Sequence, residues 1–347
     1  MITKDDPALA ALMLALERRG VGDGEQIAFL RARPHEALHP LRHRLVCEQS
    51  WKPSADELAK RGFPSQSELL ERWGEFDLVL LLPERQREQT LFDLARGISL
   101  LKPQGRLLAA MPNDWGAARY EKHLAALAPG IETLSKFHCR AFSARRTERI
   151  DAAKVDQWRR LGEMRPMVHG ERFMTCPGLF SWDKIDRGSE LLIGHLPTEI
   201  TGRVADLGAG WGFLAAFLLR ERPQMRVLDL YEADARAIDA ARHNLAFITT
   251  RTVVCFHWHD ATQDLGKTYD FIVMNAPFHT GRAAEPSLGQ RFISSAAGAL
   301  RPGGQLWMVA NQNLPYERTL ATELGDPRLI IQVGGFKVLS ATKSPRK

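Results

Sequence analysis

Short apolar runs and longer amphipathic stretches alternate along most of the chain. Each run is about four to eight residues long and rich in aliphatic and aromatic side chains, which is typical of strands buried on both faces of a sheet. The runs lie at residues 26–30, 76–83, 106–110, 204–207, 227–231, 253–256 and 270–274. Strands and helices in alternation predict an α/β fold with doubly wound, mostly parallel sheets.

Helices are predicted in the longer stretches between these runs. They lie at residues 5–19, 54–60, 65–73, 91–101, 189–196, 213–220 and 234–245. Ser54 and Ser65 begin two of them, and serine is a favoured N-cap residue. The end of the chain differs, because Gly334 and Gly335 separate two apolar stretches at 329–333 and 336–339. This arrangement predicts an antiparallel hairpin.

The two halves of the chain share a sequence pattern. Phe76–Leu81 is similar to Tyr269–Met274, and Leu101–Leu107 is similar to Leu300–Leu306. One long internal repeat, which gives two related α/β halves, explains both matches. Chance similarity is the alternative, because strand–helix–turn–strand units share their composition.

The first half lacks chemical features that the second half carries. No glycine loop follows its first strand, and Leu82-Pro83-Glu84 stands where the second half has Asn275-Ala276-Pro277. The first copy is therefore expected to have lost ligand binding and catalysis. We place the boundary after residue 165, which predicts a degenerate domain over 1–165 and a functional domain over 166–347.

Three glycines at alternate positions, Gly208, Gly210 and Gly212, join the strand at 204–207 to the following helix. Glycine lets the backbone approach a ligand closely, and the helix N-terminus offers free N–H groups beneath it. Asp206 lies just before the first glycine, where its charge would repel a pyrophosphate and attract a cation. The expected ligand is S-adenosylmethionine, which carries an ammonium and a sulfonium. A glycine-rich turn without a ligand is the alternative.

Two further acids stand near the ends of the next strands. Glu232 ends the strand at 227–231, where a carboxylate is placed to bond ribose hydroxyls. Asp260 follows the strand at 253–256, where it would accept a hydrogen bond from the adenine amino group. Both are predicted to bind S-adenosylmethionine. Capping a helix is an equally common use of an aspartate at such a position.

The composition limits the cellular compartment and the class of binding partner that are expected. The formal net charge of +6 and the pI near 9.2 favour a polyanionic partner, although a solvated basic surface would have the same composition. Because no apolar run reaches about 18 residues and the first residues lack the features of a signal peptide, no membrane association is expected. The four cysteines form no CxxC pair, which predicts reduced thiols in a cytoplasmic protein and no metal site.

The stretch from Lys136 to Arg149 combines positive charge with aromatic residues. Its four arginines are Arg140, Arg145, Arg146 and Arg149, and two phenylalanines lie among its basic residues. Phosphate contacts together with base stacking would suit this stretch to RNA. A solvated strand face at the edge of the domain is an equal alternative.

The tetrapeptide Asn275-Ala276-Pro277-Phe278 follows the strand at 270–274, at the edge of the sheet where ligands bind. It resembles the Asn-Pro-Pro-aromatic signature of class I S-adenosylmethionine-dependent methyltransferases that act on planar amino groups. The second half resembles most closely the ribosomal RNA small subunit methyltransferase C family, which methylates the guanine N2 amino group in 16S ribosomal RNA. The first half resembles that family only in architecture. The supporting stretches lie at 177–181, 186–189, 206–212, 275–281 and 336–338.

The resemblance implies roles for individual residues. The Asn275 side chain and the carbonyl of Ala276 would each accept one N–H of the target amino group, so that the nitrogen lone pair points at the methyl group. Phe278 would stack on the flipped base, beside Pro277. Asn275 and Phe180 are expected to contact the cofactor. Ala276 replaces the first proline of the signature, which keeps the carbonyl but loses some backbone rigidity.

The resemblance also implies two tandem class I methyltransferase-like domains with Rossmann-like sheets, the N-terminal one serving folding and RNA binding. The expected partner is ribosomal RNA or the small ribosomal subunit, and the expected state is a monomer. One alternative is methylation of another amino group, in large-subunit guanine, DNA adenine or protein glutamine. The other is a cofactor-binding RNA assembly factor without turnover, which Ala276 makes conceivable.

Overall fold

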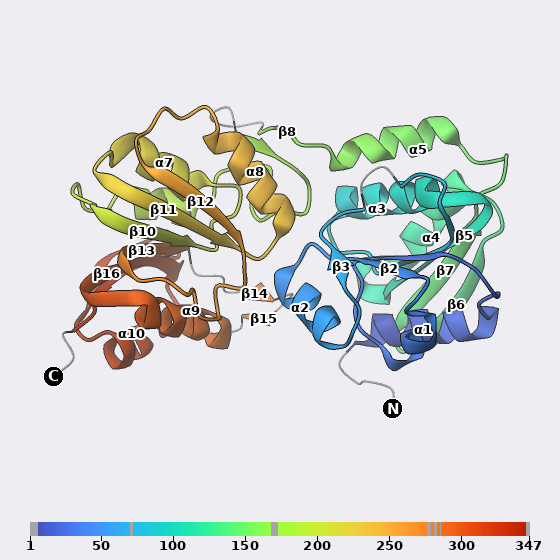
Figure 1. Cartoon of the computed structure of the whole chain (residues 1–347), viewed down its shortest axis with the longest axis horizontal. Coiled ribbons are helices and arrows are strands. Elements are labelled where there is room, and N and C mark those ends of the chain that lie inside the picture. Colours follow the sequence, from blue (N-terminus) through green and yellow to red (C-terminus); the bar gives the residue numbers. More distant parts are fainter. Residues whose placement is uncertain are drawn as a thin grey trace. The chain divides into compact units, whose positions relative to one another are not determined.

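The computed structural model describes residues 6–69, 72–167, 173–275, 279–280, 283–284 and 286–344. Contacts divide the chain into two compact units, one running up to Met164 together with Cys176–Gly178, the other comprising Arg165–Thr175 and the residues from Leu179 onward. Figure 1 shows a sheet with surrounding helices in each unit. Within the described part of the chain, no helix is both long enough and apolar enough to cross a membrane.

A seven-stranded sheet forms the centre of the first unit, in the order β3-β2-β1-β4-β5-β7-β6. Strands β1 to β5 pair in parallel, and β7 is antiparallel to both of its neighbours. The strands are β1 (Ile27–Leu30), β2 (Leu45–Glu48), β3 (Ser65–Gln66), β4 (Phe76–Leu81), β5 (Leu101–Pro112), β6 (Glu132–Lys136) and β7 (Cys139–Arg145). The α-helices are α1 (Pro7–Arg19), α2 (Lys52–Lys60), α3 (Arg87–Leu100), α4 (Ala117–Leu127) and α5 (Ala152–Arg159).

The sheet of the second unit has the order β12-β11-β10-β13-β16-β18-β17. Its strands are β10 (Gly202–Leu207), β11 (Met225–Glu232), β12 (Val253–Trp258), β13 (Tyr269–Asn275), β16 (Leu300–Asn311), β17 (Pro327–Val333) and β18 (Phe336–Thr342). The helices are α6 (Arg187–Ile193), α7 (Phe213–Glu221), α8 (Ala235–Leu245), α9 (Pro286–Ala299) and α10 (Glu317–Glu323). Two short antiparallel pairs complete the unit, β8 (Arg165–Pro166) with β9 (Met174–Thr175) and β14 (His279–Thr280) with β15 (Ala283–Ala284).

The two sheets have the same strand order, so the internal repeat predicted from the sequence is confirmed. The likeness extends to a polar contact at the start of equivalent strands. In the first unit, Asp77 Oδ2 accepts a hydrogen bond from Lys102 Nζ at 2.8 Å. In the second, Arg301 Nε pairs with Asp270 Oδ1 at 2.6 Å. The first pair links β4 to the start of β5 and the second links β13 to the start of β16, in each case where the parallel register shifts.

One predicted helix is wrong in the part that the structure describes. Ser65–Gln66, expected to begin a helix over 65–73, forms the edge strand β3 and pairs in parallel with Cys47–Glu48. Leu69 is fully buried, and its N–H donates to Glu48 Oε2 at 2.7 Å. Sheet pairing and the burial of Leu69 outweigh the local helical pattern. Residues 70 and 71 lie outside the described residues.

The remaining predicted strands and helices are present, with ends shifted by a few residues. The predicted C-terminal hairpin is confirmed, because β17 and β18 pair in an antiparallel register across Gly334 and Gly335. This hairpin adds the antiparallel edge to an otherwise parallel sheet.

Candidate active site

Strands β10, β11 and β13 end side by side at one edge of the second sheet. Leu207, near the end of β10, is paired with one residue of each neighbouring strand. Glu232 and Asn275 directly follow those two partners, and Asp206 directly precedes Leu207. The structure therefore brings together three residues that the sequence singles out. They lie at the carboxyl ends of adjacent parallel strands, the usual ligand position in an open α/β sheet.

The glycine loop has the backbone conformation that its sequence predicts. Gly208, Gly210 and Gly212 adopt positive φ angles of 72°, 54° and 91°. The N–H of Gly208 donates to the carbonyl of Tyr231 at 2.8 Å, which ties the loop to β11. A Cβ at residue 212 would lie 3.2 Å from the Ala241 Cβ on α8. Glycine at 212 thus serves both the φ angle and the close approach of two helices.

Asp206 is the most unusual side chain in the site. It is fully buried, and neither carboxylate oxygen has a hydrogen-bond partner among the residues that the structure describes. Burial, and to a smaller degree the charge of Glu232, raises the pKa of Asp206 to about 8. A buried carboxylate without partners is costly, and a bound cation would offset that cost. The position therefore fits the cationic ligand that the sequence predicts.

Glu232 stabilises the glycine loop from the end of β11. Its Oε2 accepts a hydrogen bond from Gly210 N and its Oε1 from Asp234 N, both at 2.8 Å. Burial raises its pKa above the usual range for a glutamate. Each carboxylate oxygen has more than one acceptor site. Glu232 can therefore hold the loop and still accept hydrogen bonds from a ligand's hydroxyl groups.

Asn275 is fixed by two side chains from the start of α6. Its Nδ2 donates to Asp186 Oδ2 at 2.8 Å and to Ser189 Oγ at 2.9 Å. An ionised carboxylate only accepts hydrogen bonds, so the amide must present its nitrogen to Asp186. Within the described part of the chain, Asn275 Oδ1 accepts no hydrogen bond. This oxygen is therefore available to accept an N–H from a substrate.

The sequence pattern assigns no role to Asp186 or Ser189, although both lie in the stretch 186–189 that supports the family resemblance. Asp186 is the N-cap of α6 and accepts a hydrogen bond from Ser189 N at 2.8 Å. A Cβ at the intervening Gly188 would lie 3.0 Å from both Asp186 Oδ2 and the Phe336 ring. The Asp-x-Gly-Ser spacing therefore leaves room at this helix start for the Asp186 carboxylate and the Phe336 ring. That spacing was the available signal.

The contacts of the other predicted site residues do not by themselves indicate a ligand. Ala276, Pro277 and Phe278 lie outside the described residues. Phe180 is 62% exposed, and its carbonyl accepts a hydrogen bond from Trp211 Nε1 at 3.1 Å, next to the glycine loop. Asp260 Oδ1 accepts hydrogen bonds from Thr262 N and Thr262 Oγ1 at 2.9 and 2.8 Å. Asp260 thus stabilises a turn and caps no helix in the described chain, and its contact with adenine stays a prediction.

The first unit carries different residues at the equivalent strand ends. The matching registers of β1 and β10 place Phe29 where the second unit has Asp206, and Gln49 where it has Glu232. Arg31 stands at the position of the first glycine, with a φ of 54°. Its guanidinium pairs with Asp93 at 2.7 Å and Glu84 at 2.6 Å. An internal ion pair therefore lies where the second unit has an open glycine turn.

The four arginines of the basic stretch have different environments. Arg140 pairs with Glu121 at 2.7 Å, and Arg146 donates from Nη1 to backbone carbonyls, among them that of Ser99 at 3.0 Å. These two side chains are engaged in the fold of the first unit. Arg145, at the end of β7, and Arg149 are exposed. Among the described residues, no group of three or more His, Cys, Asp and Glu side chains is arranged to hold a metal ion.

Comparisons with known proteins agree with this geometry. The family model "Methyltransferase small domain" matches residues 170–340. The ribosomal RNA small subunit methyltransferase C of Pseudomonas aeruginosa (strain UCBPP-PA14) is 31% identical over 306 residues, which cover 85% of this chain and 89% of the relative. The protein of the same name from Psychromonas ingrahamii is 28% identical over 268 residues, covering 76% of this chain and 75% of the relative.

A solved structure extends the likeness to both units. The T. thermophilus 16S rRNA N2 G1207 methyltransferase, in complex with AdoMet and guanosine, superposes with a TM-score of 0.82 at 25% identity. The match covers 98% of this chain and 92% of that protein. The two sheets of this chain are thus two tandem Rossmann-like, methyltransferase-type domains. The chain belongs to the ribosomal RNA small subunit methyltransferase C family.

Proposed function

We propose that the second unit transfers a methyl group from S-adenosylmethionine to the N2 amino group of a guanine in 16S ribosomal RNA. The observation that carries the proposal is the pairing of two features at adjacent strand ends. Asp206 is a buried carboxylate without a partner among the described residues, and Asn275 holds its side-chain oxygen as a fixed acceptor. The Asp206 carboxylate suits a cation, and the Asn275 oxygen suits an amino group. The guanine N2 and 16S rRNA assignments rest on the relatives' names.

The residues present fit S-adenosylmethionine. When bound, this group supplies a methyl carbon activated by a positively charged sulfur. Asp206 would compensate positive charge from inside the site, and Glu232 would accept hydrogen bonds from the ribose hydroxyls. The positive-φ glycines keep the loop free of side chains, so that the adenosine part can approach the backbone. Phe180 and Asp260 are proposed to border the same site.

Asn275 would act on the target nitrogen. The lone pair of a guanine amino group is delocalised into the ring, so the nitrogen is a poor nucleophile. By accepting one N–H, Asn275 Oδ1 favours a tetrahedral nitrogen whose lone pair is free to attack. Because Asp186 and Ser189 already hold the amide, little reorganisation accompanies this change. The proton released from the methylated nitrogen passes to water.

The residues after Asn275 complete the proposal. The backbone carbonyl of Ala276 would accept the second N–H, and Phe278 would stack on a base turned out of its helix. Alanine in place of proline keeps this carbonyl, so Ala276 is compatible with turnover. Pro277 would limit the backbone freedom after it.

The first unit is proposed to serve folding and RNA binding, with exposed Arg145 and Arg149 as phosphate contacts. The proposed setting is a cytoplasmic monomer that acts on ribosomal RNA or on the small subunit. The direct test is to incubate the purified protein with unmethylated small subunits and labelled S-adenosylmethionine. Nuclease digestion and mass spectrometry then identify the methylated nucleoside, which should be N2-methylguanosine.

A further inference from the structure

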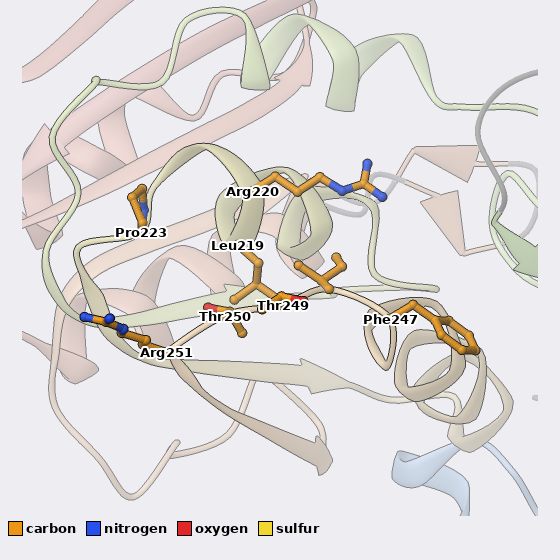
Figure 2. A pocket seen from close by; sticks show the side chains of 8 residues that line it. Leu219, Arg220, Pro223, Phe247, Thr249, Thr250 and Arg251 are labelled. Carbon is orange, nitrogen blue, oxygen red and sulfur yellow. The ribbon is translucent and has the colours of Figure 1, made fainter.

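We infer that the catalytic unit has a second RNA-binding site at the end of its sheet opposite the active site. The site is an open depression of about 750 Å³ between the end of α7 and the segment that leads into β12. Its lining includes Arg220, Phe247, Thr249, Thr250 and Arg251, shown in Figure 2. We call it the distal depression. The inference rests on the proposed function, because it concerns how that enzyme holds its RNA.

The distal depression lies at the amino ends of β11 and β12, whereas Glu232 lies at the carboxyl end of β11. At the ordinary rise of a strand, the eight residues of β11 separate the two ends by roughly 25 Å. β12 is the edge strand of the sheet and runs between the two ends. An RNA chain bound in the active site can therefore reach the distal depression along this edge.

Phe247 gives the depression a surface on which a base can stack. The side chain is 82% exposed, more than any other large apolar side chain in the described chain. The His243 ring lies 5.9 Å from the Phe247 ring, centre to centre, and is nearly perpendicular to it. Exposed aromatic rings are the usual stacking partners of unpaired RNA bases.

The charge of the depression suits the phosphate backbone. Arg220 and Arg251 line it, and none of the described lining residues is acidic. Figure 2 shows Arg251 and Phe247 at opposite ends, with Leu219 and Thr250 between them. The threonine hydroxyls add donors for phosphate or for the ribose 2′-hydroxyl. Leu219, Pro223 and Ile248 add apolar surface beside Phe247, and the two arginines at the same depression favour a phosphate-bearing partner over a protein one.

The segment that carries Phe247 and Arg251 is held in place by its own hydrogen bonds. Ile248 N donates to the carbonyl of Leu245 at 3.1 Å, at the end of α8. Thr252 N donates to Thr250 Oγ1, and Thr252 Oγ1 donates to the carbonyl of Met225, both at 3.0 Å. The segment is thus anchored to α8 and to β11. Binding there would require little ordering of the backbone.

The test compares two double variants of the full-length protein. Phe247→Ala with Arg251→Gln removes the stacking ring and one cation from the distal depression. Leu329→Ala with Arg328→Gln is the matched control, because these residues are also exposed and lie on β17, the opposite edge of the same sheet. The affinity for a 16S ribosomal RNA fragment containing the target guanine is measured by fluorescence anisotropy over a range of salt concentrations.

We expect the first variant to bind this RNA about tenfold more weakly, with the slope of log K against log salt reduced by about one. Its KM for RNA should rise while kcat and the Kd for S-adenosylmethionine stay unchanged, and Phe247→Trp should retain wild-type affinity. The control should match the wild type. Since binding is read without methyl transfer, a wild type that binds RNA but transfers no methyl group contradicts the proposed function and leaves this test intact.

Two results would overturn the inference. One is an RNA affinity and salt slope equal to those of the control. The other is a loss of affinity for assembled small subunits with no change for the naked RNA, which would assign the distal depression to a protein. Arg251→Glu distinguishes damage to the fold from loss of a contact. Its negative charge should weaken RNA binding more than Arg251→Gln does, with the melting temperature unchanged. If the melting temperature is unchanged and RNA binding is not weakened, the inference is also overturned.

Discussion

Asn275 Nδ2 lies 2.8 Å from Asp186 Oδ2, although the two residues are 89 positions apart in the chain. The contact joins the end of a central strand to the N-cap residue of a short helix. Because the carboxylate engages the nitrogen of the amide, the side-chain oxygen is the atom left for a substrate. This pair sets the orientation on which the proposed chemistry depends.

Asn275→Ala should lower kcat by roughly 100-fold and leave the Kd for S-adenosylmethionine nearly unchanged, because the lost acceptor acts on the transition state. Asp186→Ala should lower kcat by roughly 10-fold through loss of orientation, and should cost about 1 kcal/mol of stability as a lost helix cap. Steady-state kinetics and calorimetry measure these effects.

The double variant separates positioning from direct action. If Asp186 acts only by orienting Asn275, Asp186→Ala should have almost no further effect on kcat in the Asn275→Ala background. If the loss of kcat in the double variant equals the two single losses combined, Asp186 contributes to turnover by another route.

Asp206 makes the stability of the ligand-free protein dependent on pH. Its pKa is raised to about 8 in the folded state and is ordinary in the unfolded chain, so between these values the folded protein holds a proton that the unfolded chain has lost. Stability should therefore fall as the pH rises from about 5 to about 8. Asp206→Asn should raise the melting temperature at pH 8 and have little effect at pH 5.

Thermal unfolding of both proteins at the two pH values checks this effect, and excess S-adenosylmethionine should remove most of the pH dependence of the wild type. Equal melting temperatures of wild type and Asp206→Asn at pH 8 would contradict the assignment of an unpaired buried carboxylate.

The chain should bind one molecule of S-adenosylmethionine, in the second unit. Phe29, Arg31 and Gln49 occupy the equivalent positions of the first unit, and the Arg31 ion pairs lie where a ligand would approach. Titration calorimetry on the full chain should give a stoichiometry of one, and Glu232→Ala should abolish the signal. Gln49→Ala is the matched control and should bind normally. A second saturable site would refute the degeneracy of the first unit.

The basic stretch should divide into structural and RNA-binding arginines. Arg146→Ala should lower the melting temperature, because its guanidinium donates to backbone carbonyls of the first unit. Arg145→Gln with Arg149→Gln should leave stability unchanged, weaken RNA binding and flatten its salt dependence. Arg61→Gln, which changes another exposed arginine of the same unit, is the control. An unchanged salt slope would make the stretch only a solvated surface.

The part of the site that is formed by residues adjacent in the sequence could largely be predicted. Asp206, the three glycines and the start of α7 follow one another directly, so their pattern specifies a strand, a turn and a helix together. The repeat was also visible, because equivalent strands keep similar residues at the same spacing. The helix expected at 65–73 failed because pairing with β2 and burial of Leu69 are tertiary effects.

Contacts between distant residues could not be predicted. The hold of Asp186 and Ser189 on Asn275 depends on how α6 meets the end of β13. In the same way, Arg140 and Arg146 read as free positive charge in the sequence, and their partners, Glu121 and the backbone of the first unit, are brought to them only by the fold.

The proposed activity of this chain is methylation of the guanine N2 amino group in 16S ribosomal RNA. The most direct measurement incubates purified wild-type protein and Asn275→Ala with unmethylated small subunits and labelled S-adenosylmethionine, then maps the modified nucleoside by mass spectrometry. We predict N2-methylguanosine at one position with the wild type and a rate roughly 100-fold lower with Asn275→Ala. Label in a different nucleoside or in a protein would contradict this activity, and an equal rate with Asn275→Ala would contradict the role of Asn275.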